Sequence, residues 1–178
     1  MAHHLSPEPS GWDRNASGVY LVTLVTRGRK LLLGEVVRGE MSLSAHGRVV
    51  ADEWERLAAA YPSVGFDAYQ VMPNHLHAIV RLAGPRSPAR RVRGRRARCP
   101  TATLGALIAR FKGAVVRRIN AAYGTPRASF WEGGYRDILI RNQGELEAVR
   151  RYVRENPSQW DEDVENPRRP FDRAPLPW

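Results

Sequence analysis

Two histidines one residue apart are the most chemically suggestive feature of the sequence. His75 and His77 flank Leu76 inside the largely apolar run at residues 69–80. If this run is a β-strand, positions i and i+2 share a face, so both imidazoles project together while Leu76 points into the core. Neutral imidazole is the commonest metal ligand in proteins, so the pair could form half of a divalent-ion site. Two polar residues at a strand end more often have no such role, so the spacing alone is weak evidence.

A second candidate lies near the end of the last predicted helix, at residues 143–155. An apolar stripe along this helix has Tyr152 beside it, where a ring can be half buried with its hydroxyl outside. Tyr152 and Asn156 are four residues apart and share a face, so a phenol and a carboxamide could be presented together. A core tyrosine and a C-capping asparagine would give the same pattern, and periodicity alone favours that structural role.

The elements that would position these residues do not follow one another as repeated βαβ units. The turn residues Pro73 and Asn74 join two apolar runs as a hairpin, with the histidines at the start of the returning strand. We therefore expect an α+β domain whose antiparallel sheet has helices on one face. Strands are predicted at residues 18–26, 31–37, 41–43, 66–72, 75–82 and 135–140, and helices at 44–60, 101–122 and 143–155.

Length and composition restrict the class of protein. The chain has 178 residues, enough for one domain with a sizeable core. It has no run of 18 apolar residues and no apolar signal-peptide core at its N-terminus, so we expect no membrane partner and a cytoplasmic location. The single cysteine, Cys99, excludes an internal disulfide and a cysteine-based zinc site.

The charge balance favours a polyanionic partner. Lys and Arg number 28 against 18 Asp and Glu, a net charge of +10, which indicates nucleic acid first and an anionic membrane surface second. The scarcity of lysine is mostly attributed to a GC-rich genome. Seven arginines lie between Arg86 and Arg98, in a block without core residues that we expect to be mobile.

Five sequence blocks follow one another along the chain: VMPNHLHAIV at 71–80, FKGAV at 111–115, FWEGGYRD at 130–137, IRN at 140–142 and RYVRENP at 151–157. In this order they resemble the single-tyrosine HUH transposases, and especially the REP-associated tyrosine transposases of bacteria. The stretch at residues 20–54 is also similar to the opening strands and first helix of that family. Each block alone is weak, but the ordered set is specific and spans roughly residues 18–160.

The resemblance implies a ferredoxin-like HUH-endonuclease domain that cleaves and rejoins single-stranded DNA through a 5′-phosphotyrosine. His75 and His77 match the metal-binding pair of the family, and Tyr152 matches its nucleophile. Asn156 matches the position of a third ligand, where some relatives carry glutamine. The implied cofactor is Mg²⁺ or Mn²⁺, of which Mn²⁺ tolerates nitrogen ligands better. The implied domains are an arm at 1–16, a catalytic domain at 17–160 with an arginine-rich insertion at 84–100, and a tail at 161–178.

The implied substrate is single-stranded DNA that contains a hairpin. The implied location is the bacterial cytoplasm, in association with the nucleoid. A groove of basic and aromatic residues suits such a strand. For each basic candidate, a solvated face or a surface ion pair is about equally expected. A homodimer, with Tyr152 of one chain near the histidines of the other, is one arrangement that the resemblance allows. The candidates for phosphate contacts are Arg110, Lys112, Arg117, Arg118, Arg136 and Arg141.

Two other functions stay open at this point. The first is a catalytically inactive, basic nucleic-acid-binding module derived from such a transposase. It would bind with steep salt dependence and form no covalent adduct. The second is a metal-dependent hydrolase that uses the histidine pair with a carboxylate, for which Asp67 and Asp137 are the obvious acids. Its hydrolysis would survive Tyr152→Phe.

Overall fold

The fold is given by a computed structural model that describes residues 17–83, 103–124 and 129–169. The predicted N-terminal arm, the whole arginine-rich insertion at 84–100, and residues 170–178 of the predicted tail lie outside the described residues.

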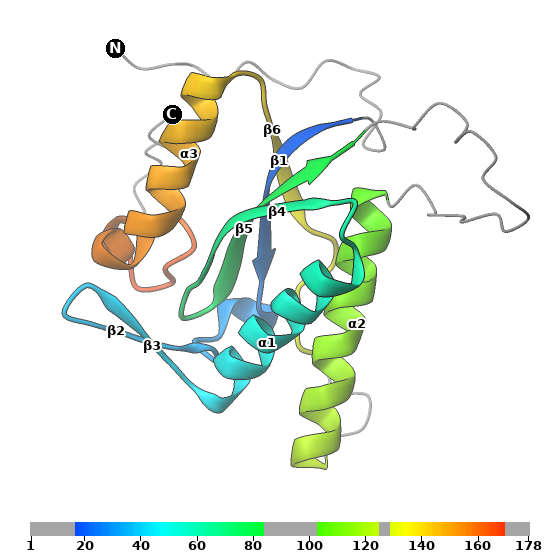
Figure 1. The fold of residues 1–178 in the computed structure, drawn as a ribbon. Helices are drawn as coiled ribbons and strands as arrows, with labels where there is room; N and C mark the ends of the chain where they lie inside the picture. Colours follow the sequence, from blue (N-terminus) through cyan, green and yellow to red (C-terminus); the bar gives the residue numbers. More distant parts are fainter. Residues whose placement is uncertain (1–16, 84–102, 125–128, 170–178) are drawn as a thin grey trace, which may run out of the picture.

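A four-stranded antiparallel sheet forms the centre of the domain (Figure 1). Its strands lie in the order β4-β5-β1-β6, with β1 at Gly18–Val25, β4 at Gly65–Val71, β5 at His75–Leu82 and β6 at Arg136–Ile140. A helix follows the first and the third of these strands in the chain, so the arrangement is ferredoxin-like. The helices are α1 at Ala45–Ala60, α2 at Leu104–Tyr123 and α3 at Gln143–Glu155. A separate hairpin pairs β2 at Gly34–Val37 with β3 at Glu40–Leu43.

Each predicted helix and strand is present, with two differences in detail. The predicted strand at 31–37 begins only at Gly34, because the backbone of Leu33 bonds to Pro73 and Ser44 rather than to a strand. The 3₁₀-helices η1 at Arg27–Arg29 and η2 at Asn156–Glu162 were not predicted. None of the described helices is both long and apolar enough to cross a membrane.

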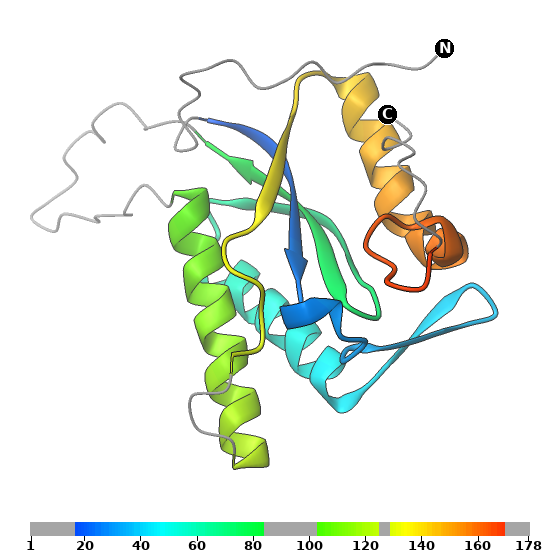
Figure 2. The ribbon, with the colours of Figure 1, turned by 180° about the vertical axis from the view of Figure 1, so that it is seen from behind.

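Helices cover both faces of the sheet, so the prediction of helices on one face holds for α1 and α2 only (Figures 1 and 2). Even-numbered residues of β1, such as Tyr20 and Val22, pack with α1 and α2. Leu21 and Ile79 point the other way and pack against α3. The apolar stripe of α3 is well suited to this second, smaller core, which comprises Leu21, Ile79, Ile140, Leu146, Val149 and Val153.

Local interactions fix where α3 begins and how it lies on the sheet. The Asn142 side chain caps the helix by accepting from the Glu145 N–H. The Glu145 carboxylate reaches back and accepts from the Arg141 N–H, one residue before the N-cap, in a variant of the capping box. Further along, the Arg150 guanidinium donates two hydrogen bonds to Asp67 on β4, at 2.9 and 2.6 Å. This pair ties α3 to the edge strand of the sheet.

Replacing Asp67 by Asn is expected to loosen α3. The hydrogen bonds to Arg150 lower the pKa of Asp67 in the folded protein below its ordinary 3.8. The stabilisation that the ionised Asp67 gives the fold is therefore complete above the ordinary pKa, and it is lost as pH falls through the lower pKa of the folded protein. The pair is partly exposed, so we expect a melting temperature lower by roughly 2 °C at pH 7. Thermal unfolding of both proteins at pH 7 and pH 3 checks this, with Glu155→Gln, an exposed position of the same helix, as the control. A difference in melting temperature between wild type and Asp67→Asn that is larger at pH 3 than at pH 7 would contradict this expectation.

Candidate metal centre and nucleophile

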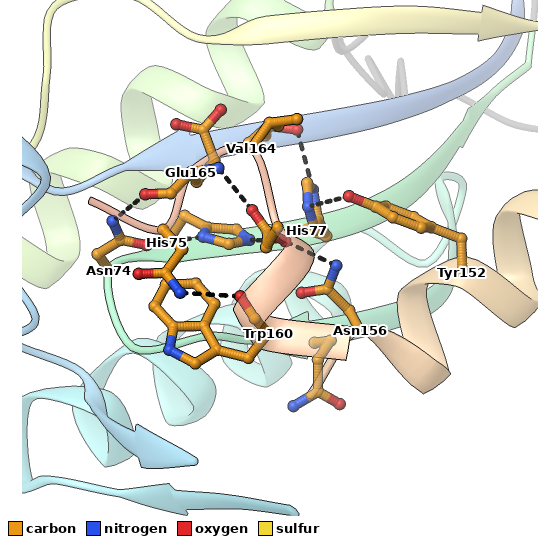
Figure 3. A network of polar contacts seen from close by, with 12 residues as sticks. Asn74, His75, His77, Tyr152, Asn156, Trp160, Val164 and Glu165 are labelled. Atoms are coloured by element: carbon orange, nitrogen blue, oxygen red, sulfur yellow. Dashed lines mark hydrogen bonds and ion pairs between the residues drawn. The ribbon is translucent and has the colours of Figure 1, made fainter. Parts of the chain in front are cut away.

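Strand β5 brings His75 and His77 to the same face of the sheet, as their spacing predicts. Leu76 is fully buried on the opposite face, within the core under α1 and α2. The two imidazoles are 0% and 4% exposed, and their ring centroids lie 4.5 Å apart. Both rings project toward α3 and the residues that follow it (Figure 3).

The hydrogen bonds of Asn74 determine which nitrogen of His75 carries the proton. The Asn74 Nδ2 donates to the carbonyls of Glu165, at 2.7 Å, and Arg29, at 3.2 Å. Its Oδ1 therefore accepts from His75 Nδ1 at 2.8 Å, which leaves the lone pair on Nε2. That Nε2 has no hydrogen-bond partner among the described residues and lies 3.8 Å from an Asp163 oxygen. A buried imidazole lone pair without a partner is a ready metal ligand.

His77 is also supported through its Nδ1, by its neighbour on β1. Its Nδ1 lies 2.9 Å from the hydroxyl of Thr23, the residue directly opposite it in the antiparallel pair. Its Nε2 lies 3.2 Å from the hydroxyl oxygen of Tyr152. Both histidines thus use Nδ1 for support and direct Nε2 into the cluster, the arrangement expected of supported metal ligands.

Burial keeps both histidines uncharged. The pKa of His75 is lowered to about 3, mainly by removal of the ring from water and also by the positive charges of Arg136 and Arg29. The pKa of His77 lies well below its ordinary value, again mainly because of burial, with the neighbouring His75 adding to the effect. At neutral pH both rings are therefore in the form that binds metal.

Asp163 joins the two histidines, although the sequence analysis did not select it. It lies directly after η2 and is buried, and its carboxylate accepts from the Glu165 N–H at 2.6 Å and from Asn156 Nδ2 at 2.8 Å. One ligand atom from each of His75, His77 and Asp163 lies within 4.8 Å of the others. These three residues could hold a metal ion. Burial raises the pKa of the Asp163 carboxyl, as expected where a negative charge lacks full compensation.

Asn156 also lies at the cluster, as its four-residue spacing from Tyr152 predicts. It is 1% exposed, and its amide nitrogen points to Asp163. Its Oδ1 has no hydrogen-bond partner among the described residues. The cluster therefore offers two imidazole nitrogens and oxygens from both Asn156 and Asp163, a donor set that fits Mg²⁺ or Mn²⁺.

Tyr152 projects from α3 toward the histidines (Figure 3). Its ring is half-buried, and the centroid lies 5.3 Å from that of His77. Burial raises the pKa of Tyr152 above its ordinary 10, and the charge of Asp163 adds to this, while a hydrogen bond with Asn156 and the charge of Arg136 oppose it. The phenol is therefore protonated at neutral pH and would need further positive charge beside it to become a nucleophile.

Of the six basic candidates, the structure brings Arg136 to the cluster. Arg136 forms an ion pair with Glu165, which also lies 3.5 Å from Arg29. Both arginines line a cleft of about 290 Å³ together with Thr23, the support of His77. The negative charge of Glu165 is thus shared by two guanidinium groups that stay about half exposed.

The other basic candidates lie elsewhere. Lys112 Nζ donates to the carbonyls of Glu132 and Gly134, at 2.6 Å each, and so holds that turn. Arg118 is paired with Asp52 and Glu53 of α1. Arg110 and Arg117 are exposed on α2, which packs on the face away from the histidines, and Arg141 is exposed just before α3.

The two acids considered with a hydrolase do not reach the histidines. Asp67 is bonded to Arg150. Asp137 lies opposite Val22, so it points to the face of α1 and α2 rather than to that of His77. The acid that does reach them, Asp163, belongs to a run of four carboxylates in residues 161–165. In so basic a chain, that run was the available signal.

Residues 161–169, which the sequence assigns to a tail, pack against the two histidines and contribute Asp163 to the cluster. Asp163, Glu165 and Asn166 are buried, and the Asn166 side chain donates to the carbonyl of Trp160 at 3.0 Å. The division of the chain into arm, domain and tail stays a prediction, but the site draws on residues beyond 160.

Comparison with known proteins supports the resemblance. No family model matches the chain. A Haemophilus influenzae protein described as uncharacterized is 25% identical over 173 residues, covering 90% of this chain and 92% of that protein. A solved REP-associated tyrosine transposase bound to a REP hairpin matches with a TM-score of 0.53 and 15% identity, over 88% of this chain and 74% of its own. A proposed transposase from Deinococcus radiodurans matches at a TM-score of 0.49 and 14% identity, over 84% and 96%.

The chain therefore has the α+β fold of a solved tyrosine transposase. The resemblance that the sequence blocks indicate is confirmed at the level of the fold.

Manganese is expected to stabilise the folded protein through this cluster. A ligand at 100 times its dissociation constant contributes about 2.7 kcal/mol, so the melting temperature should rise when Mn²⁺ is added to metal-free protein. His77→Gln should abolish the rise, whatever it does to the metal-free melting temperature. His46→Gln is the matched control, because His46 stacks on Tyr123 away from the cluster. Differential scanning calorimetry measures both; an undiminished rise in His77→Gln would place the ion elsewhere.

Proposed function

We propose that this protein is a metal-dependent single-stranded DNA transposase or nicking endonuclease that cleaves and rejoins DNA through a 5′-phosphotyrosine at Tyr152. The observation that carries the proposal is the position of the Tyr152 hydroxyl, 3.2 Å from His77 Nε2 and beside a His-His-Asp cluster. The fold of a tyrosine transposase supports it.

Tyrosine chemistry would proceed in two balanced steps. The Tyr152 oxygen attacks the scissile phosphorus and gives up its proton to water, while the bond from phosphorus to the 3′ oxygen breaks and that oxygen takes up a proton from water. A free 3′-hydroxyl and a 5′-phosphotyrosine form. A 3′-hydroxyl from another strand then attacks the same phosphorus and releases the tyrosine. Because the covalent intermediate conserves the phosphodiester, joining needs no external energy source.

The residues of the cluster would have different roles in this reaction. His75 and His77, both uncharged, would hold a divalent ion together with an oxygen from Asn156 or Asp163. Such an ion supplies Lewis-acid polarisation of the phosphate and offsets charge in the transition state. Arg136 would hold a phosphate next to the scissile one, from the rim of the cleft.

The site would work within a single chain. Tyr152 reaches His77 of its own chain, so a second copy is not required to bring the nucleophile to the ligands. A homodimer stays a prediction, and its role would then be to hold two DNA ends rather than to complete the site.

The substrate we propose is a single strand that contains a hairpin. The solved transposase of this fold is bound to a REP hairpin. The net charge of +10 supports an extended phosphate backbone as the ligand. A bacterial protein that acts on chromosomal repeats would be found with the nucleoid.

A metal-dependent hydrolase is the second candidate, favoured by the carboxylate of Asp163 beside both histidines. In that case the nucleophile would be water, and Tyr152 would be a positioning residue only. The inactive binding module is the third candidate, and an intact cluster with an adjacent phenol counts against it.

Covalent trapping on labelled hairpin DNA with Mn²⁺ separates these three functions. We expect a protein–DNA band that survives a denaturing gel and disappears in Tyr152→Phe and with EDTA. Loss of the nucleophile should lower the yield at least about 1000-fold, to background. Tyr123→Phe is the matched control, because Tyr123 is half exposed at the far end of α2.

Two results would contradict the tyrosine mechanism. Strand cleavage that forms no adduct, and that persists in Tyr152→Phe, would favour the hydrolase. Tight binding with neither cleavage nor adduct would favour the binding module.

Arg136 is expected to contribute a phosphate contact because it lines the cleft beside Thr23, on the face of the histidines. Arg118 is not, because it lies on α2 on the other face of the sheet, where it is paired with Asp52 and Glu53. Arg136→Gln should weaken hairpin binding and reduce the slope of log affinity against log salt by about one. Arg118→Gln should leave the slope unchanged. Fluorescence anisotropy at several salt concentrations measures this; equal slopes in wild type and Arg136→Gln would remove Arg136 from the interface.

A further inference from the structure

The metal cluster offers two oxygen donors, of which one carries a charge. Asn156 is the residue that the family resemblance assigns as third ligand, and Asp163 has no assigned role. Both side chains are buried, and Asn156 Nδ2 donates a hydrogen bond to Asp163 Oδ2 at 2.8 Å. The geometry of this bond distinguishes their roles.

The Asp163 carboxylate is held so that one oxygen faces the histidines. Its Oδ1 accepts from the backbone N–H of Glu165 at 2.6 Å. Its Oδ2 lies 3.8 Å from His75 Nε2, the nitrogen that has no hydrogen-bond partner among the described residues. The two groups are too far apart for a hydrogen bond but close enough to share one ion between them.

The bond to Asp163 also fixes the amide orientation of Asn156. An ionised carboxylate only accepts hydrogen bonds, so the amide nitrogen, and not the oxygen, must face Asp163. Asn156 Nδ2 donates to the same Oδ2 that faces His75. On this side, Asn156 therefore presents a donor that steadies the carboxylate, which is what an outer partner of a metal ligand does.

Charge favours the carboxylate as ligand. Within the described residues, the salt bridges of Arg29 and Arg136 go to Glu165, and the ion-pair contact of Asp163 is with His75. Arg136 and Arg169 act on Asp163 only from a distance, without a direct ion pair among the described residues. A buried carboxylate that no cation contacts directly is costly, and a divalent ion would remove that cost. Hard divalent ions such as Mg²⁺ also prefer carboxylate oxygen to neutral donors.

We infer that Asp163 is the anionic ligand of the divalent ion and that Asn156 is a positioning residue that acts through Asp163. The inference rests on the proposed function only in placing an ion at His75 and His77. It makes the residues after α3 part of the metal site.

Binding of Mn²⁺ to the full, metal-free chain tests this without reference to DNA cleavage. The electron paramagnetic resonance signal of free Mn²⁺ gives the dissociation constant directly. Asp163→Asn should weaken binding at least about 100-fold, and Asn156→Ala about 10-fold, the loss typical of an outer partner. The double variant should bind no more weakly than Asp163→Asn alone, because the effect of Asn156 passes through Asp163.

Asp161→Asn is the matched control, since it removes the same charge from an exposed position two residues away. Its effect should stay within about twofold, as expected for a screened surface charge. Asp163→Asn keeps the oxygen that accepts from Glu165, so the metal-free melting temperature should be unchanged or higher. Asp163→Glu should retain more affinity than Asp163→Asn, an order that a purely structural role would not produce.

The outcomes that overturn the inference differ from those that overturn the proposed function. Affinity retained in Asp163→Asn but lost in Asn156→Ala would make Asn156 the ligand and leave the proposed function intact. Additive losses in the double variant would make both residues independent ligands and also overturn the inference. If the wild-type protein binds no Mn²⁺, both the inference and the metal dependence in the proposed function are wrong.

Discussion

The alternation of side chains along β5 is the constraint on which the rest of the site depends. Leu76 and Ala78 are buried under α1 and α2, so His75 and His77 must face the other side of the sheet. A slip of one residue in the pairing with β1 would exchange the two sets and bury both imidazoles in the larger core. The register therefore decides which face carries the chemistry. It also requires α3 to lie on the face opposite α1 and α2, because Tyr152 could not otherwise reach His77.

Burial of the cluster makes its electrostatics unusual for a phosphate-binding site. The two imidazoles are uncharged, and the nearby carboxylates of Asp163 and Glu165 are opposed by the guanidinium groups of Arg29 and Arg136. This set is close to neutral overall and would attract a phosphate only weakly. With a divalent ion bound, the same residues would carry net positive charge in a region poorly screened by water. The positive charge would also oppose the effects that raise the pKa of Tyr152.

The sequence could predict the residues that lie in regular elements, and it missed those that do not. His75, His77 and Tyr152 occupy a strand and a helix whose periodicity is clear, so their shared faces follow from spacing. Asp163 follows a 3₁₀-helix with no repeating pattern, and only the fold brings it back to the histidines. The same holds for the basic residues. Composition shows that they are numerous, but their partners, such as Asp52 for Arg118, lie far away in the sequence.

The segment after α3 and the turn before β5 hold each other in place through one side chain. Asn74 donates to the carbonyls of Arg29 and Glu165 and accepts from His75. The orientation of the His75 ring is thereby linked to the segment that carries Asp163. A displacement of that segment would remove an oxygen donor and the support of an imidazole together. The geometry of the cluster is therefore a cooperative property of the strand, the helix and the segment that follows it, rather than of the His-Leu-His sequence alone.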